Sequence, residues 1–353
     1  MVSQENTMNV GNDAAGYIPV EADFKFKHTD GELALDDNFA AQSFWKDVLI
    51  RYFKKISAVI GLILIIIITV FAIIGPGMND FSYSEQSLTQ KNFAPRVKGL
   101  EKLGIFDGSE GMKTTTGTKK INYYEEKGLD DLYYWFGSDN FGRDIWTRTW
   151  SGARVSLIIA VIIDMVIGMS YGLISGYFGG KVDMFMQRFL EVANGIPRLV
   201  IVTLLLLVLQ PGMLTIIFAL MLTEWVGMSR IARAEMLKLK EQEFVLASRT
   251  LGAGNFFIIF KEVLPNIIGP IITQVMFSIP TAIFTEAFLS FVGLGIPVPQ
   301  CSLGSLISEG FNSFTTHPYQ IIPPIVVMAL LMLSFNLVAD GLREALDPKL
   351  KEM

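Results

Sequence analysis

The side chains that most often carry chemistry are scarce in this sequence. It holds two histidines, His28 and His317, and a single cysteine, Cys301, among 353 residues. They are too few and too widely spaced for a Cys–His catalytic pair or a His-rich metal site. The phosphate-binding pattern GxxxxGK[ST] does not occur either. We therefore predict that this chain is not an enzyme and holds no catalytic residue, metal or cofactor of its own.

Three carboxylates, Asp164, Glu224 and Glu286, interrupt stretches made almost entirely of apolar residues. If such a stretch crosses a bilayer, a carboxylate near its centre costs about 3 kcal/mol, so it must face other helices or a water-filled cavity. Two roles stay open for each: hydrogen bonding that holds helices together, or lining of a translocation path. Glu286 follows Pro280, and a helix broken at that proline would leave carbonyl groups facing a cavity.

Long apolar segments must position these residues. Charged residues make up 18% of the chain, against about 25% in an ordinary soluble domain, and 51% are hydrophobic. The stretch AVIGLILIIIITVFAIIGP is long enough to cross a hydrocarbon core of about 30 Å. The sequence predicts an all-α polytopic membrane protein with about six transmembrane helices, the fifth kinked or broken at Pro270 and Pro280. They lie at 57–77, 156–178, 196–210, 212–228, 265–294 and 319–341.

Lysine and arginine set the predicted orientation. They cluster before the first span, after the second, after the fourth and after the sixth, whereas the connections at 210–212 and 295–318 contain none. Because cytoplasmic loops carry the basic residues, both termini are expected in the cytoplasm of a multi-pass protein of the cell (plasma or inner) membrane. The net charge of −5 and the absence of a basic run argue against nucleic acid as a partner. The partner that the apolar segments predict is the lipid bilayer.

The rest of the chain divides around these spans. In order, we expect a flexible cytoplasmic tail (1–43), an interfacial amphipathic helix (44–56), the first span (57–77), an extracellular loop or small domain (78–152), a transmembrane core (153–343) and a cytoplasmic C-terminus (344–353). Within the extracellular segment, Asp139, Arg143 and Asp144 of the stretch SDNFGRD are expected to fix the loop to a helix end by ion pairing, rather than to contact substrate.

A stripe of glycines marks one face of the second span and its continuation. Gly168, Gly172, Gly176 and Gly180 recur every four residues, a spacing that lets membrane helices approach closely.

The cytoplasmic loop at 229–264 contains helix formers and turn residues in a definite order. Residues 229–250 hold no glycine or proline and predict an uninterrupted helix. LGAGN then predicts a turn, in which Gly252 can take a positive φ and Asn255 caps the next helix. Pro265 is expected to open the fifth span.

One face of this predicted loop helix is apolar. Phe244, Val245, Ser248 and Leu251 fall at helical spacing. The face either packs on the chain's own spans or docks into a groove on a soluble partner.

The loop and four other stretches resemble a known family. Ala247-Ser248, Gly252 and Leu264-Pro265 have the spacing of the EAA loop of binding-protein-dependent ABC transporter permeases, although Leu246 stands where that loop has its glutamate. Other stretches resemble the second (C-type) permease of the oligopeptide/dipeptide branch. They are WFGSDNFGRDIWTRTWSGARVSL (135–157), GYFGGKVDMFMQRFLEVANGIP (176–197), TEAFLSFVGLGIPVP (285–299) and FNLVADGLREALDPKL (335–350).

The resemblance implies a type I ABC importer permease fold and a peptide importer. It implies a heterodimer with a homologous permease, two ATP-binding subunits that hold ATP and Mg, and an extracellular substrate-binding protein. Two roles stay open for the tyrosines and Trp135 of the predicted extracellular segment. They either contact the substrate-binding protein or pack against each other as a cap over the pore. The loop would couple the chain to the ATPases. Its expected contact residues are Phe244, Val245, Ala247, Ser248, Gly252, Leu264 and Pro265.

Two alternatives stay open. Related permeases import nickel or other small solutes with the same motifs. A secondary transporter would need no ATPase, but it would show an inverted repeat, and the sequence shows none. Preference for peptide length and sequence is expected to reside mostly in the binding protein.

Overall fold

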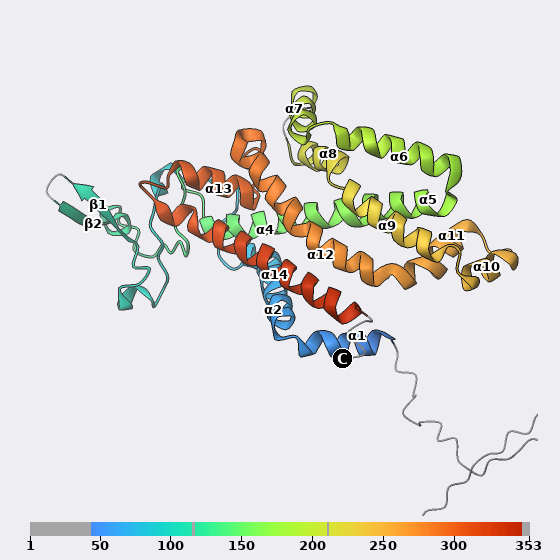
Figure 1. Ribbon diagram of the computed structural model, residues 1–353. Helices are drawn as coiled ribbons and strands as arrows, with labels where there is room; N and C mark the ends of the chain where they lie inside the picture. Colours follow the sequence, from blue (N-terminus) through green and yellow to red (C-terminus); the bar gives the residue numbers. More distant parts are fainter. Residues whose placement is uncertain (1–43, 115–116, 210–211, 348–353) are drawn as a thin grey trace, which may run out of the picture. The chain divides into compact units, whose positions relative to one another are not determined.

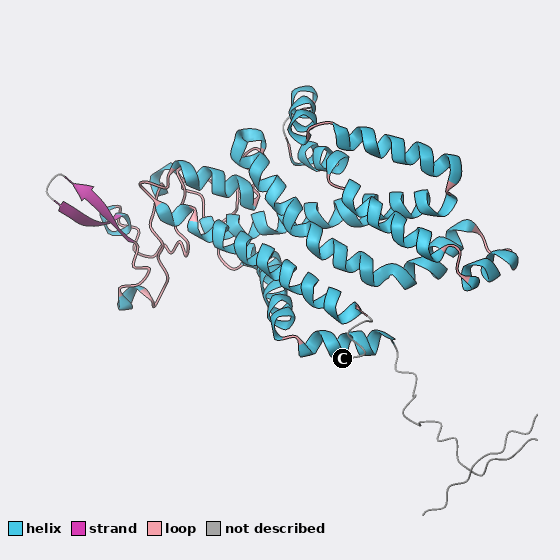
Figure 2. Ribbon diagram, in the orientation of Figure 1, coloured by secondary structure: helices cyan, strands magenta, loops and turns pink. Residues whose placement is uncertain are grey.

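The computed structural model describes residues 44–347 apart from 115–116 and 210–211. The predicted tail, 1–43, and residues 348–353 lie outside the described residues. The chain separates into two units, Met1–Lys46 and Asp47–Met353, and all the candidate spans belong to the second. Helices dominate, as Figure 2 shows, so the predicted helical membrane fold is confirmed. One antiparallel hairpin, β1 (Ser109–Thr114) with β2 (Gly117–Asn122), departs from an all-α chain.

Four helices among the described residues are long and apolar enough to cross a bilayer. They are Ile56–Gly77, containing α2 (Ile56–Ile74); Ile145–Phe178, containing α4 (Ile145–Ile162) and α5 (Met169–Phe178); Asn255–Leu294, containing α11 (Asn255–Phe257) and α12 (Leu264–Leu289); and Pro318–Leu346, containing α14 (Ile322–Leu346). The segment predicted to be extracellular, 78–152, includes the first eight residues of α4.

The fifth span is not broken at its prolines, and the kink given as the other outcome stays a prediction. α12 runs through Pro270 and Pro280 as one helix, and Pro280 is buried. A proline removes one helix hydrogen bond, which neighbouring helices offset when the segment is well packed. Irregular geometry appears instead at the two ends of α12, as π-helical turns at Ile258–Val263 and Ser290–Leu294.

The third and fourth predicted spans are each only part of a bent pair. α7 (Arg198–Val208) and α8 (Met213–Thr223) have 11 residues apiece, about 16 Å of helix and half of a bilayer core. α6 (Gly180–Gly195) lies at 87° to Leu199–Val208, and Leu214–Leu222 lies at 47° to α9 (Val226–Leu239). The described chain therefore has four spans, or up to six if each bent pair counts as one. Pro197 explains the sharper bend, because it holds Ile196 in an extended conformation.

The core forms where α12 and α14 pack on each other and on α2 and α4 (Figure 1). Its largest cluster of buried side chains includes Ile68, Leu173, Ile279 and Leu331. A Cβ at Gly61 would lie 2.8 Å from the carbonyl oxygen of Ser334, so this glycine permits the close contact between α2 and α14.

Three of the four stripe glycines lie where α5 and the π-helical turn before it meet α9. A Cβ on Gly168, Gly172 or Gly176 would come within 2.2–2.9 Å of α9 atoms. Gly180 does not belong to this contact, because a Cβ there would meet nothing within 4 Å. The chain has already turned at Gly179, and Gly180 itself has φ +52°. Gly180 continues the four-residue spacing in the sequence, but α5 has ended before it. Gly180 therefore does not lie on the helix face that the other three glycines share.

The segment between α2 and α4, which is predicted to be extracellular, has a small core of its own. Phe93, Tyr124 and Tyr134 are buried together, and the hydroxyl of Tyr124 donates to the carbonyl oxygen of Ala94 (2.8 Å). Burial raises the pKa of both tyrosines. α3 (Tyr123–Glu126) carries Tyr124 into this core, while Trp135 packs edge-on against Trp146 of α4. Tyr124 and Tyr134 pack inward, so they are not available for contact with a partner.

Candidate functional site

In the loop predicted to be cytoplasmic, 229–264, residues 229–250 form two helices where one was predicted. α9 ends at Leu239 and α10 (Glu243–Thr250) begins after an extended Gln242. The end of α9 is held to α5 just before the break, because Lys240 donates from Nζ to the carbonyl oxygen of Gly176 (3.2 Å). Val245, one turn into α10, is fully buried in the main core cluster. Local sequence favours helix throughout, but the chain bends here so that Val245 reaches the core.

A tight turn joins α10 to α11. The backbone N–H groups of Gly252 and Ala253 donate to the carbonyl oxygens of Arg249 and Ser248, both at 3.0 Å. Gly252 has φ +85°, and a Cβ on it would meet nothing within 4 Å. The residue is therefore glycine for its backbone conformation and not for lack of space. Gly254, and not Asn255, precedes the next helix; Asn255 instead accepts from the hydroxyl of Tyr177 (2.9 Å).

The loop presents apolar side chains to its surroundings. Phe244 is 39% exposed and Leu251 88% exposed, whereas Val245 faces the core, so the predicted apolar face is divided between the two directions. Ala247 and Pro265 are exposed, and Ser248 and Leu264 are half-buried. Beside the turn lies an open cavity of about 430 Å³ lined by Ser248, Leu251, Gly252, Ala253, Gly254, Phe257 and Glu262. The arrangement suits the docking of an external partner against the turn.

Glu286 is fully buried where several elements of the core meet. Its carboxylate accepts hydrogen bonds from the hydroxyls of Ser290 (2.8 Å), Ser302 and Ser156 (3.3 Å). Ser290 ends α12, Ser302 caps α13 (Leu303–Asn312), and Ser156 belongs to α4. A buried carboxylate is tolerated when its oxygens have hydrogen-bond donors. In this conformation Glu286 joins helices, which is the first of the two roles left open for it.

The other two intramembrane carboxylates are less informative. Asp164 lies in the π-helical turn Ile163–Gly168, and its side chain is outside the described part of the structure. Glu224 follows α8, where its backbone N–H donates to Leu220, and its side chain is half-buried.

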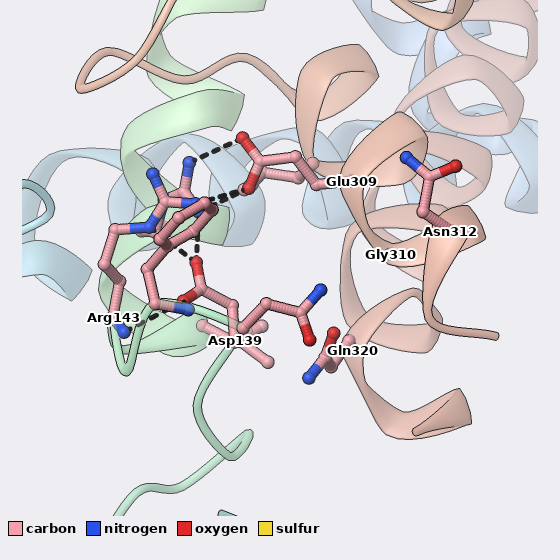
Figure 3. Close-up of a pocket in the computed structure, with 11 residues that line it drawn as sticks. Asp139, Arg143, Glu309, Gly310, Asn312 and Gln320 are labelled. Carbon is pink, nitrogen blue, oxygen red and sulfur yellow. Dashed lines mark hydrogen bonds and ion pairs between the residues drawn. The ribbon is translucent and has the colours of Figure 1, made fainter. Parts of the chain in front are cut away.

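At the N-terminal end of α4, two buried arginines form a compact charge cluster with two carboxylates. Figure 3 shows Asp139 and Glu309 flanking the guanidinium groups. Arg143 reaches Asp139 and Glu309 at 2.6 Å each, and Arg148 reaches Asp139 at 2.5 Å and Glu309 at 2.7 Å. Both arginines are 1% exposed. We call Asp139, Arg143, Arg148 and Glu309 the arginine ion cluster; it ties α4 and the segment that precedes it to α13.

Asp144 has a different part from the one predicted for it. Its Oδ2 accepts from the backbone N–H and hydroxyl of Thr147 and from Asn79, so it caps the start of α4. Burial raises its pKa, and these hydrogen bonds oppose the rise. Ion pairing by Asp139 and Arg143 does lock the loop to a helix. The sequence argument missed Arg148 and Glu309, the latter because it is 161 residues away from the arginine that it pairs with.

No group of three or more His, Cys, Asp or Glu side chains suited to hold a metal ion occurs within the described ranges.

The chain resembles known proteins over most of its length. Residues 168–352 match the family model described as "Binding-protein-dependent transport system inner membrane component", and residues 43–95 match "N-terminal TM domain of oligopeptide transport permease C". It is 39% identical over 313 residues to the oligopeptide transport system permease protein OppC of Bacillus subtilis, covering 88% of this chain and 91% of the relative. It is 40% identical over 313 residues to the dipeptide transport system permease protein DppC of the same organism, covering 88% and 87%.

Among solved structures, a chain of the inward-facing MetNI methionine ABC transporter aligns with 57% of this chain and 95% of its own length. The TM-score is 0.45 at 16% identity, too loose a likeness to carry an argument.

Proposed function

Because the chain belongs to the family of binding-protein-dependent transport system inner membrane components, we propose that it is the C-type permease subunit of an ATP-driven peptide importer. The observation that carries the proposal is 39–40% identity, over 88% of the chain, to permeases named for oligopeptide and dipeptide transport. Both family models fall on the same chain in the order expected for that branch, the N-terminal model first.

The loop at 229–264 is the coupling element in this proposal. A partner ATPase would dock against the turn, where Leu251 stands 88% exposed beside an open cavity. Val245, buried in the core, would then carry the movement of α10 into the membrane helices. Phe244, Ala247, Ser248 and Gly252 form the contact region, and Leu264 and Pro265 lie where the loop passes into α12.

Three kinds of partner complete the proposed transporter. A homologous permease would form the other half of the pore, and two ATPase subunits would bind ATP and Mg²⁺. A substrate-binding protein would deliver the peptide from outside. The chain itself contributes pore helices and the coupling loop, with no catalytic group.

Purification of the tagged chain from its native membrane in mild detergent tests the proposal. We expect a second polytopic protein and ATPases carrying the GxxxxGK[ST] pattern to co-purify. The recovered complex in proteoliposomes should take up labelled di- to pentapeptides in the presence of ATP and binding protein. Uptake of nickel in place of peptides would overturn the substrate assignment, and recovery of the chain alone would overturn the whole assembly.

The variant Leu251→Glu locates the ATPase contact in the same experiment. A carboxylate placed at the most exposed apolar position of the turn should remove the ATPases and leave the second permease bound. Leu103→Glu is the matched control, because Leu103 is 72% exposed on the extracellular segment. Equal ATPase recovery with both variants would contradict docking at the turn.

A further inference from the structure

A cationic cavity lies between α1 (Phe44–Lys54) and the C-terminal end of α14. Its volume is about 220 Å³, and it is lined by Arg51, Lys54, Lys55, Gly341, Glu344 and Ala345. Three positively charged side chains thus face a space that holds one carboxylate. The cavity is far along the chain from the coupling loop and is not part of the proposed transport function.

Two of the cations have donors left over after their internal contacts. Arg51 pairs with Asp47 through one terminal nitrogen (3.0 Å) and donates to the carbonyl oxygen of Asp347 through the other (3.4 Å). Its Nε is buried and has no hydrogen-bond partner among the described residues. Lys54 is exposed and makes no ion pair within the described part of the chain, while Lys55 pairs with Glu344. With Asp47 and Glu344 counted, these five groups carry a net single positive charge.

The helices that line the cavity are packed closely together. A Cβ on Gly341 would lie 2.2 Å from the Cβ of Ala58 and 3.1 Å from the ring of Tyr52, so α14 lies directly against α1 and α2 here. The hydroxyl of Tyr52 donates to the carbonyl oxygen of Ala58 (3.1 Å) and fixes the junction of the two helices. Little ordering would therefore be needed when an anion binds.

Exposed apolar side chains surround the cationic residues along the chain. Leu49, Phe53 and Ile56 are 53%, 56% and 75% exposed, and the exposed Ile60 and Ile63 continue onto α2, which begins the first span. Basic and apolar residues combined in this way are typical of a helix that lies in the headgroup region of a bilayer. An anion that reaches the cavity from this side would be the headgroup of a lipid.

We propose that the cavity between α1 and α14 binds the phosphate of an anionic phospholipid headgroup, with Lys54 as the donor and the charges of Arg51 and Lys55 adding to the attraction. The acyl chains would lie along the exposed isoleucines of α2. Bound lipid would then join the first span to the last helix at the cytoplasmic surface. Basic pockets between membrane helices are suited to such headgroups on electrostatic grounds.

Thermal unfolding of the full-length chain in a neutral maltoside detergent tests the site. The unfolding midpoint would be followed against dihexanoyl-phosphatidylglycerol, dihexanoyl-phosphatidylcholine and inorganic phosphate, because a ligand of the folded state raises it with concentration. We expect phosphatidylglycerol to raise the midpoint at concentrations where the other two do not. Lys54→Gln should weaken its apparent affinity about fivefold, since one lysine near an anionic surface contributes about that factor.

Two variants separate this site from general charge effects and from a soluble anion. Lys181→Gln removes an exposed lysine at the start of α6 and should leave the affinity unchanged. Phe53→Ser removes an apolar contact and should weaken phosphatidylglycerol alone. Equal effects of the two lysine variants would overturn the cavity as the site. Stabilisation by inorganic phosphate equal to that by phosphatidylglycerol would assign it to a soluble anion and overturn the lipid proposal.

Discussion

Two glycines in this chain are required for opposite reasons, and the difference can be measured. At Gly252 the surroundings are empty and the backbone has φ +85°. At Gly172 a Cβ would lie 2.2 Å from the carbonyl oxygen of Ser229. The first glycine is set by conformation and the second by contact, so the same substitution tests a different physical quantity at each.

Gly252→Ala should impair the coupling loop without affecting membrane insertion. An alanine at positive φ costs about 1–2 kcal/mol, which is enough to shift the turn to another conformation. We expect ATP-dependent peptide uptake by the assembled transporter to fall several-fold. Gly254→Ala is the matched control, because Gly254 also has open space around it but φ −69°. Equal uptake by the two alanine variants would show that the geometry of the turn does not matter for coupling.

Among helix contacts, the one between α5 and α9 is the closest that any glycine of the second span allows. Gly172 and Gly176 each bring α5 against backbone oxygens of α9. The side chain of Asp183, at the start of α6, receives two hydrogen bonds of 2.6 Å from Arg233 of α9. The base of the loop at 229–264 is therefore held to α5 by packing and to α6 by charge. Movement of α9 must carry α5 with it.

Gly172→Ala should separate α5 from α9 and lower the thermal unfolding midpoint of the detergent-solubilised chain. Forcing one methyl group into such a contact costs about 1–3 kcal/mol. Gly227→Ala, in α9 itself, provides the comparison, since a Cβ there meets nothing within 4 Å and alanine favours helix over glycine. It should leave the midpoint unchanged or raise it. If both variants lowered the midpoint alike, the close approach of α5 and α9 would not limit stability.

For the whole molecule, orientation in the membrane decides how the two candidate surfaces are used. The segment between α2 and α4 adjoins the N-terminal end of α4, and the loop at 229–264 contacts the C-terminal end of α5 through Gly176 and Tyr177. These ends belong to one 34-residue helical stretch, about 50 Å long and longer than a hydrocarbon core. The two regions are therefore expected on opposite sides of the membrane, with the basic coupling loop in the cytoplasm.

Thiol labelling in intact cells tests this orientation. In a Cys301→Ser background, a membrane-impermeant reagent should label Leu103→Cys directly and Leu251→Cys only after permeabilisation. Both positions are highly exposed in the chain by itself, and the cells are made without the ATPase subunits so that a docked partner does not cover Leu251→Cys. Removal of Cys301 should be harmless, since burial raises the pKa of its thiol and its Sγ contacts only a backbone oxygen among the hydrogen bonds described. Direct labelling of Leu251→Cys in sealed cells would reverse the predicted topology.

The sequence by itself determined the membrane-spanning class, the first span, the family resemblance, and the turn at Gly252. These follow from local properties: apolar run length, spacing of basic residues, and the need of a turn for positive φ. The packing of Gly168, Gly172 and Gly176 was also predictable, since a four-residue spacing within one continuous helix defines a face.

Only the tertiary structure decided which distant groups meet and where helices bend. Arg148 and Glu309 form an ion pair although they are 161 residues apart in sequence. Glu286 accepts hydrogen bonds from hydroxyl groups of α4 and of the residue that caps α13. No local sequence pattern encodes these contacts. The break between α9 and α10 interrupts a run of good helix formers because burial of Val245 in the core outweighs local propensity. Propensity differs by tenths of a kcal/mol per residue, whereas burying one large apolar side chain contributes about 1.5–3 kcal/mol, so packing prevails wherever the two disagree.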